Sequence, residues 1–147
     1  MKLFVWLAVV SLFLVLAPAA EACIPDPQTL CLNNNRFQVR VNWAVQSQGT
    51  SGQGQATLIR NAQGQVVDDS GLFWFFNQDN MELVIKVLDG CGVNNRFWVF
   101  AGGLTNVDVT LTVTDTHTPT FQSVTYRHTE GPAFPPIQDT GAFATCP

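Results

Sequence analysis

Cysteine is the residue type in this 147-residue chain whose spacing points most directly to chemistry. Cys23, Cys31, Cys91 and Cys146 form an even set, and no two of them have the C-x-x-C spacing of zinc or thioredoxin-like sites. We therefore expect two structural disulfides, for which four cysteines allow three pairings. The pairing that we expect is Cys23–Cys31, closing a short proline-containing loop, with Cys91–Cys146, tying the C-terminal tail to the body; the other two pairings stay open.

Acid–base and metal chemistry have few candidates in this sequence. His117 and His128 fall in a turn and at the end of an expected strand, where solvated histidines are common. The acidic turn residues lack the spacing of a known calcium loop, and no nucleophile elbow or phosphate-binding glycine loop is present. An enzyme would have to bring two of six residues into one cleft: Asp68, Asp69, Glu82, Asp89, His117 and His128. We predict a protein that is not an enzyme and holds no metal or cofactor.

Clustered aromatic residues are the strongest candidates for binding. The segments Leu72–Phe76 and Phe97–Phe100 are apolar at consecutive positions, so only one face of each strand can enter a core. The other face is either covered by the C-terminal segment 132–143, which would bring Phe134, Pro135, Pro136 and Ile137, or open as a platform for sugar rings or a partner protein. The candidate platform residues are Trp74, Phe76, Trp98 and Phe100.

Composition excludes several classes of protein. Only 12% of the residues are charged, about half of the roughly 25% usual in soluble domains, and the formal net charge is −4. Neutral polar residues, mainly Thr, Gln and Asn, replace the missing charges. Seven Lys and Arg are too few for a basic nucleic-acid binder, and 46% apolar residues are too many for a disordered tail.

The first 22 residues have the pattern of a signal peptide. Lys2 precedes an apolar run from Leu3 to Leu16, and the sequence Ala-Glu-Ala before Cys23 is an A-x-A cleavage site. The run is too short to span a bilayer comfortably, and no later stretch is long enough. We expect one domain over residues 23–147, secreted to an extracellular or periplasmic space. The alternative, a lipid anchor on Cys23, is disfavoured because Glu21 fits a lipobox poorly and because lipidation would leave one cysteine unpaired.

Beyond residue 22 the sequence has the two-residue periodicity of strands. The alternation is clearest in 36–45 and 107–114, and no window has helical spacing. Further strands are expected at 55–60, 65–67, 72–76, 81–88, 96–100 and 121–128, with a polar loop at 46–54 and turns at 61–64 and 68–71. Seven or eight short strands predict an all-β, antiparallel, immunoglobulin-like β-sandwich.

One sequence pattern occurs twice. Cys31-x-x-Asn34-Asn35-Arg36-Phe37 is repeated sixty residues later as Cys91-x-x-Asn94-Asn95-Arg96-Phe97. The match stops two residues further on. Turn chemistry explains it better than an old duplication, because Asn tolerates the left-handed backbone that precedes many strands.

Several blocks together resemble a β-rich module that recurs in exported bacterial proteins, alone after a signal peptide or at the end of longer chains. The most specific blocks are Glu82–Gly90 and Phe97–Phe100, and the likeness covers nearly all of 23–147; Thr118-Pro119-Thr120 departs from the Thr-Gly turn usual there. The resemblance implies an exported β-module and transfers no site residue.

The sequence thus predicts a secreted, disulfide-linked, non-catalytic module. We expect it to contact a protein partner or a surface; the alternative is a carbohydrate-binding module in which Trp74 and Trp98 stack on polysaccharide. No nucleic acid, membrane span or cofactor is expected.

Overall fold

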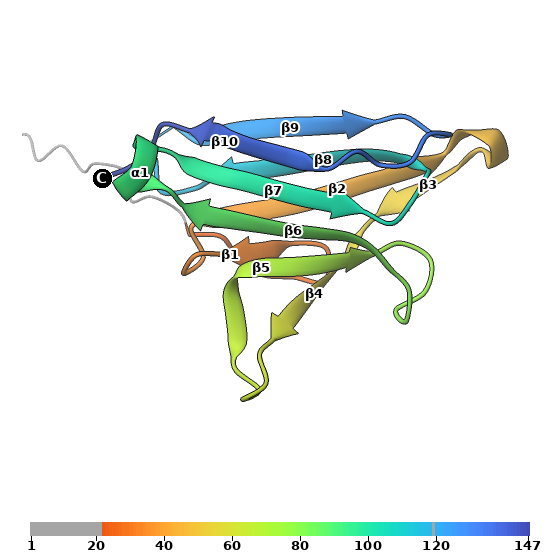
Figure 1. The fold of residues 1–147 in the computed structure, drawn as a ribbon. Helices are drawn as coiled ribbons and strands as arrows, with labels where there is room; N and C mark the ends of the chain where they lie inside the picture. Colours follow the sequence, from red (N-terminus) through yellow and green to blue (C-terminus); the bar gives the residue numbers. More distant parts are fainter. Residues whose placement is uncertain (1–21, 119) are drawn as a thin grey trace, which may run out of the picture.

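The computed structural model describes residues 22–118 and 120–147, which form ten antiparallel strands in two sheets (Figure 1). The predicted signal peptide and Pro119 of the predicted 118–120 turn therefore lie outside the described residues, apart from Ala22. Sheet 1 contains β1 (Leu30–Leu32), β2 (Phe37–Val45), β3 (Thr50–Gln53), β8 (Asp108–Asp115) and β9 (Gln122–His128). Sheet 2 contains β4 (Gln55–Arg60), β5 (Val66–Trp74), β6 (Met81–Asp89), β7 (Phe97–Gly103) and β10 (Ile137–Phe143). The prediction of an all-β fold is confirmed.

The two sheets share one hydrophobic core, and alternation along each strand decides which side chains enter it. In β8 every second residue from Val109 is buried, whereas the threonines between them are half-buried on the outer face. Across the core, the ring of Phe37 in β2 lies 5.0 Å from that of Phe97 in β7 and 5.2 Å from that of Phe143 in β10. Aromatic pairs at this separation join the two layers at one end of the molecule.

Each sheet has its own strand order. Sheet 1 runs β1-β2-β8-β9, with β3 also on β2, beyond the short β1. Sheet 2 runs β10-β7-β6-β5-β4, so β4 is an edge strand. The start of β5 leaves β6 and pairs only with β4, and this hairpin projects from the body (Figure 1).

The polar segment 46–54, predicted as a loop, is mostly regular structure. It contains the 3₁₀ turn η1 (Gln46–Gln48) and β3, which pairs with β2. The chain then changes sheet at Gly54, whose amide donates to the Val41 carbonyl. A Cβ at Gly54 would lie 3.1 Å from Phe73 and Val41, so a larger residue at this crossing would require these neighbours to shift by a few tenths of an ångström. The strand was missed because its side chains are short, polar and mostly exposed.

Other boundaries also differ from the prediction. The expected turn at 68–71 lies inside β5, which runs unbroken from Val66 to Trp74, so Phe75 and Phe76 follow the strand. Three elements were not predicted: β1, β10 and the four-residue helix α1 (Cys91–Asn94). Strand β1 has three residues and β10 is an edge strand, and the sequences of such strands show little two-residue periodicity.

Both predicted disulfides are confirmed. Cys23 is bonded to Cys31, and Cys91 to Cys146. The second bond joins the start of α1 to the C-terminal tail, next to a buried ion pair. There, Arg36 donates from Nη2 to Asp115 Oδ2 at 2.7 Å and to the Thr145 carbonyl at 2.6 Å. The tail is thus held covalently to α1 and by hydrogen bonds of Thr145 to Arg36 and Asp115.

The repeated Asn-Asn-Arg-Phe pattern is explained by turn geometry. Asn35 and Asn95 both have left-handed backbones, with φ of 62° and 58°, immediately before strands β2 and β7. Their surroundings otherwise differ, because Arg36 lies in the ion pair whereas the Arg96 side chain donates to the neighbouring Asn95 carbonyl.

Candidate functional site

Trp98 and Phe100 lie on the outer face of β7, away from the core. Their rings are half-buried and meet edge to face with centroids 6.3 Å apart. The Trp98 indole N–H donates to Asn94 Oδ1 at 2.8 Å, and the ring lies against Gly90, where a Cβ would come within 2.3 Å. One side of the indole is therefore used for packing, which leaves the Trp98–Phe100 edge as the accessible part.

Trp74 and Phe76 lie elsewhere. Trp74 pairs with Met81 at one end of β6, whereas Trp98 pairs with Leu88 near the other end, so the two indoles are separated by roughly 20 Å along the strand. Phe76 is 52% exposed, and its ring packs on Trp43 with centroids 4.8 Å apart. The structure brings Trp98 and Phe100 together but does not join them with Trp74 and Phe76 in one platform.

The C-terminal segment does not cover the Trp98–Phe100 face. Instead, β10 pairs with the edge of β7 and widens sheet 2, with Ile137 opposite Ala101 and Gln138 opposite Phe100. Phe134, which was one of the expected covering residues, and Phe143, at the end of the expected covering segment, are both buried in the core. Of the two alternatives, the structure therefore shows the open one, because this segment pairs with the free edge of β7 and places Phe134 and Phe143 in the core.

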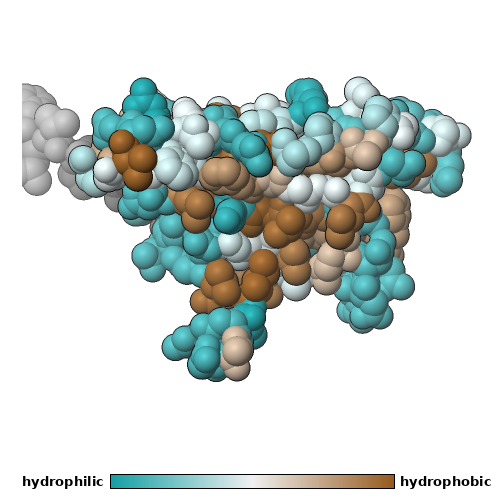
Figure 2. All heavy atoms as spheres, in the orientation of Figure 1, coloured by the Kyte–Doolittle hydropathy of each residue, from teal (hydrophilic) through white to brown (hydrophobic). Residues whose placement is uncertain are grey.

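The uncovered outer face of sheet 2 holds a shallow groove of about 290 Å³. Figure 2, which looks onto this face, shows apolar side chains gathered along its middle. Val84 is 43% exposed in the groove, and the Lys86 ammonium lies 5.5 Å from the centre of the Phe100 ring. Ser70, Gln138 and Ile137 complete its rim from β5 and β10. This surface, formed by Ser70, Val84, Lys86, Phe100, Ile137 and Gln138, is called the sheet 2 groove below.

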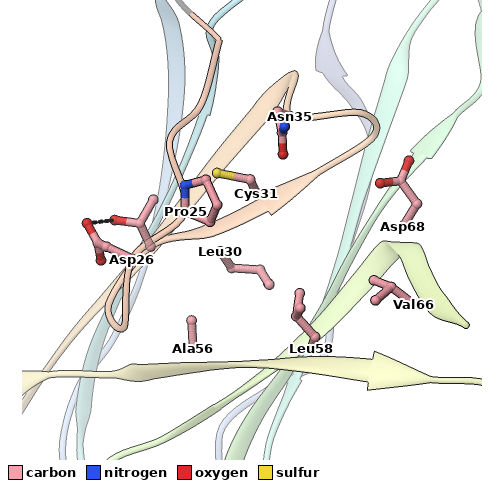
Figure 3. A pocket seen from close by; sticks show the side chains of 10 residues that line it. Pro25, Asp26, Leu30, Cys31, Asn35, Ala56, Leu58, Val66 and Asp68 are labelled. Atoms are coloured by element: carbon pink, nitrogen blue, oxygen red, sulfur yellow. Dashed lines mark hydrogen bonds between the residues drawn. The ribbon is translucent and has the colours of Figure 1, made fainter. Parts of the chain in front are cut away.

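A second hollow, of about 390 Å³, lies between the N-terminal segment and the projecting hairpin (Figure 3). Leu58, Val66 and Ala56 from the hairpin face Leu30 across it. Leu58 is 49% exposed and Val66 42% exposed, although both are apolar. Asp26 and Asp68 lie at its rim, and no Lys or Arg lines it. We call this hollow the hairpin cleft.

Both acidic groups of the hairpin cleft are held in place by hydrogen bonds. Asp26 accepts from the Gln28 amide at 2.7 Å and from the Thr29 hydroxyl at 2.9 Å, and these bonds hold the pKa of its carboxyl below the usual range. Asp68 accepts from the Asn34 amide at 2.9 Å. The cleft therefore presents carboxylates beside apolar side chains.

The six acid–base candidates do not form one cleft. Glu82 and Asp89 lie near opposite ends of β6, and His128 pairs with Val109, at the other end of β8 from Asp115 and the neighbouring His117. Asp68 and Asp69 are on the projecting hairpin. Within residues 22–118 and 120–147, no three His, Cys, Asp or Glu residues are grouped as metal ligands would be.

The most buried charged group among the described residues is Asp115, whose side chain is fully buried and which was not a predicted site residue. Burial raises the pKa of its carboxyl, but hydrogen bonds from Arg36, Thr145 and the His117 amide outweigh burial and leave the pKa below its usual value. The Arg36 guanidinium also lies 4.2 Å from the centre of the Phe97 ring. All partners of Asp115 are thus internal, and the ion pair is structural.

Comparisons of the chain with family models, with curated proteins and with solved structures find no match. In the part of the chain that the structure describes, no helix is long and apolar enough to cross a membrane.

Proposed function

We propose that this protein is an exported, non-catalytic binding module that contacts a protein partner or a surface through the sheet 2 groove. The observation that carries the proposal is that no segment of residues 22–118 and 120–147 covers the outer face of sheet 2, although this face is apolar around Val84 and Phe100. Exposed apolar patches on soluble proteins usually mark contact surfaces. The export and β-module character expected from the resemblance are part of the proposal, as is the immunoglobulin-like class of sandwich, which two antiparallel sheets around one core support.

Two disulfides support a location outside the reducing cytoplasm. We place the protein in an extracellular or periplasmic space. Because Cys23 is bonded to Cys31, its sulfur is not free for lipidation, which favours secretion over a lipid anchor.

The chemistry of the groove defines the partner that it fits. Lys86 is its single charged residue, and the one salt bridge among the described residues joins Arg36 to Asp115 instead. A complementary surface would carry apolar side chains for Val84 and Phe100 and a carboxylate for the Lys86 ammonium. The amide of Gln138 and the hydroxyl of Ser70 add hydrogen-bonding groups at the rim.

Site-specific photo-crosslinking in the native host tests this assignment. A photo-reactive amino acid replaces Val84 on the sheet 2 groove or, as the matched position, Thr112 on the outer face of sheet 1. We expect a discrete protein crosslink from position 84 and none from position 112. Once purified, the crosslinked partner should bind more weakly to Lys86→Glu than to the control Arg40→Glu. Equal crosslinking from both faces, or none from Val84, contradicts the proposal.

The second candidate is a carbohydrate-binding module, favoured by the uncovered Trp98–Phe100 edge beside the polar rim of the groove. A pull-down of the folded protein with insoluble polysaccharides decides between the two. If the parent protein binds a polysaccharide, and this binding is lost in Trp98→Ala but kept in Trp74→Ala, the ligand is a polysaccharide and not a protein.

A further inference from the structure

Strand β4 forms one edge of sheet 2, and the N-terminal segment of the chain pairs with part of that edge. Strand β4 pairs with β5 on one side, and on its other side the Ala56 amide donates to the Pro27 carbonyl at 2.8 Å. The N-terminal segment thus occupies one hydrogen-bonding position of this edge. Pro25 and Pro27 prevent it from pairing further, since proline has no amide donor.

The next position along the same edge is open. Backbone groups alternate along a strand, so the amide and carbonyl of Leu58 point in the same direction as the Ala56 amide, away from β5. No hydrogen bond from the described residues reaches the Leu58 amide or carbonyl on that side. An unpaired edge of this kind is a template for another strand.

Side chains at this position also lack partners. The hairpin extends past sheet 1, whose edge strand β1 has three residues, so the core-facing sides of Leu58 and Val66 line the hairpin cleft instead of a core (Figure 3). The cleft volume of about 390 Å³ is within the range of about 300–1,000 Å³ found for ligand sites. An added strand would both pair with β4 and bury these two side chains.

The charge of the cleft selects the occupant. Asp26 and Asp68 lie at the rim, with no cation among the lining residues. Two cations on the neighbouring strands have other partners: Arg60 of β4 donates to the Gly64 carbonyl, and Arg40 of β2, which also attracts the Asp26 carboxylate, donates to the Thr29 hydroxyl. A segment with a lysine or arginine beside its apolar residues therefore complements the cleft.

We propose that the β4 edge at Leu58 is an acceptor site for an extended segment of a protein partner, in which apolar side chains alternate with basic ones. The segment would add to sheet 2 by backbone hydrogen bonds to Leu58, place apolar side chains against Leu58 and Val66, and set its basic groups beside Asp68 and Asp26. This site is separate from the sheet 2 groove and does not depend on its function.

Selection from a displayed random peptide library against the purified, disulfide-bonded protein is the first test. We expect enriched peptides to alternate apolar and basic residues, and a synthetic peptide of that sequence to bind about tenfold or more weakly to Leu58→Asp. Leu104→Asp is the matched control, since Leu104 is 82% exposed and lies outside the cleft. Asp68→Lys should reverse the preference for basic peptides.

Backbone methylation separates strand addition from side-chain binding. N-methylation of the peptide at alternate residues should weaken binding about tenfold in one register and leave it unchanged in the other, because only every second amide faces β4. Leu58→Pro, which removes the edge donor while keeping the β5 pairing, should weaken binding to a similar extent in a protein with unchanged thermal unfolding.

Three results would overturn the proposal. They are enrichment of acidic peptides or of no peptide at all, equal effects of N-methylation in both registers, and a loss of peptide binding in Leu104→Asp that equals the loss in Leu58→Asp. If the parent protein self-associates and Leu58→Asp abolishes that association, the occupant of the site is a second copy of this chain and not another protein.

Discussion

The outer faces of the two sheets differ both in the regularity of strand pairing and in the side chains that they present. On sheet 1, β2, β8 and β9 pair without a break in register, and their outward side chains are polar or charged except for Ala44. On sheet 2, register shifts interrupt the β4–β5, β5–β6 and β7–β10 pairings, and outward side chains include Val84, Trp98 and Phe100. Side chains from both inner faces form the one hydrophobic core. Core formation and surface contact are therefore separable, because only the strands of sheet 2 carry large apolar side chains outward; beside sheet 1, the exposed Ile24 and Phe121 lie outside its strands.

The largest effects on stability should come from the disulfides, and they should be unequal. In the chain-entropy model, the Cys91–Cys146 bond, spanning 55 residues, stabilises by about 4 kcal/mol, and Cys23–Cys31, spanning 8 residues, by about 2.5 kcal/mol. Paired Cys→Ala variants in urea unfolding measure both values. Equal losses would show that native contacts, such as those of Thr145 with Arg36, outweigh loop entropy.

Cavity-forming substitutions should cost the same on the inner faces of both sheets. Leu111→Ala in sheet 1 and Ile85→Ala in sheet 2 each remove a fully buried side chain, so each should lower the free energy of unfolding by about 2–5 kcal/mol. Urea midpoints of the two variants and the parent provide the measurement. A Leu111→Ala midpoint equal to that of the parent would place this residue outside the core.

Acid should destabilise the end of sheet 1 through Asp115. Its folded-state pKa lies below the unfolded value of about 3.9, so its contribution is complete above that pH and is lost as pH falls through the folded pKa. Asp115→Asn should therefore be less stable than the parent at pH 7, and the difference should shrink below about pH 4. Thermal unfolding from pH 2 to pH 7 tests this, with Asp79→Asn as an exposed control; a constant difference would contradict the assignment.

The smallest effects should come from exchanging outer-face residues. Val84→Thr on sheet 2 and Thr112→Val on sheet 1 should each change stability by about 0.5 kcal/mol or less, because both side chains are at least partly exposed. Binding of an apolar fluorescent dye should nevertheless fall in Val84→Thr. Dye binding that is unaffected by Val84→Thr would remove the contrast between the two outer faces.

Strong alternation made most of the fold predictable. Strands β2, β6 and β8 were predicted to within a few residues because buried and exposed positions alternate clearly in them. Strand β3 was not, since TSGQ has no apolar side chain and is ordered by its pairing with β2. The turn expected at 68–71 was wrong for a related reason: the Asn33 amide donates to the Asp68 carbonyl, and this long-range bond helps to hold turn-forming residues in an extended strand.

The candidate sites were less predictable than the fold. Trp98 and Phe100 were named from their sequence, and their shared outer face follows from the period of β7. Their separation from Trp74 depends on strand order, which periodicity does not contain. Leu58 and Val66 gave no signal, because each is an ordinary strand residue until the hairpin projects beyond sheet 1.

The class of fold, the number of disulfides and the side chains that alternate into the core could be predicted from the sequence, because each depends on local periodicity or on counting residues. Which outer face stays open and which strand edge stays free could be seen only in the folded chain. Those depend on where β10 and the N-terminal segment come to lie, and that is set by competition among edges, cavities and faces distant in sequence.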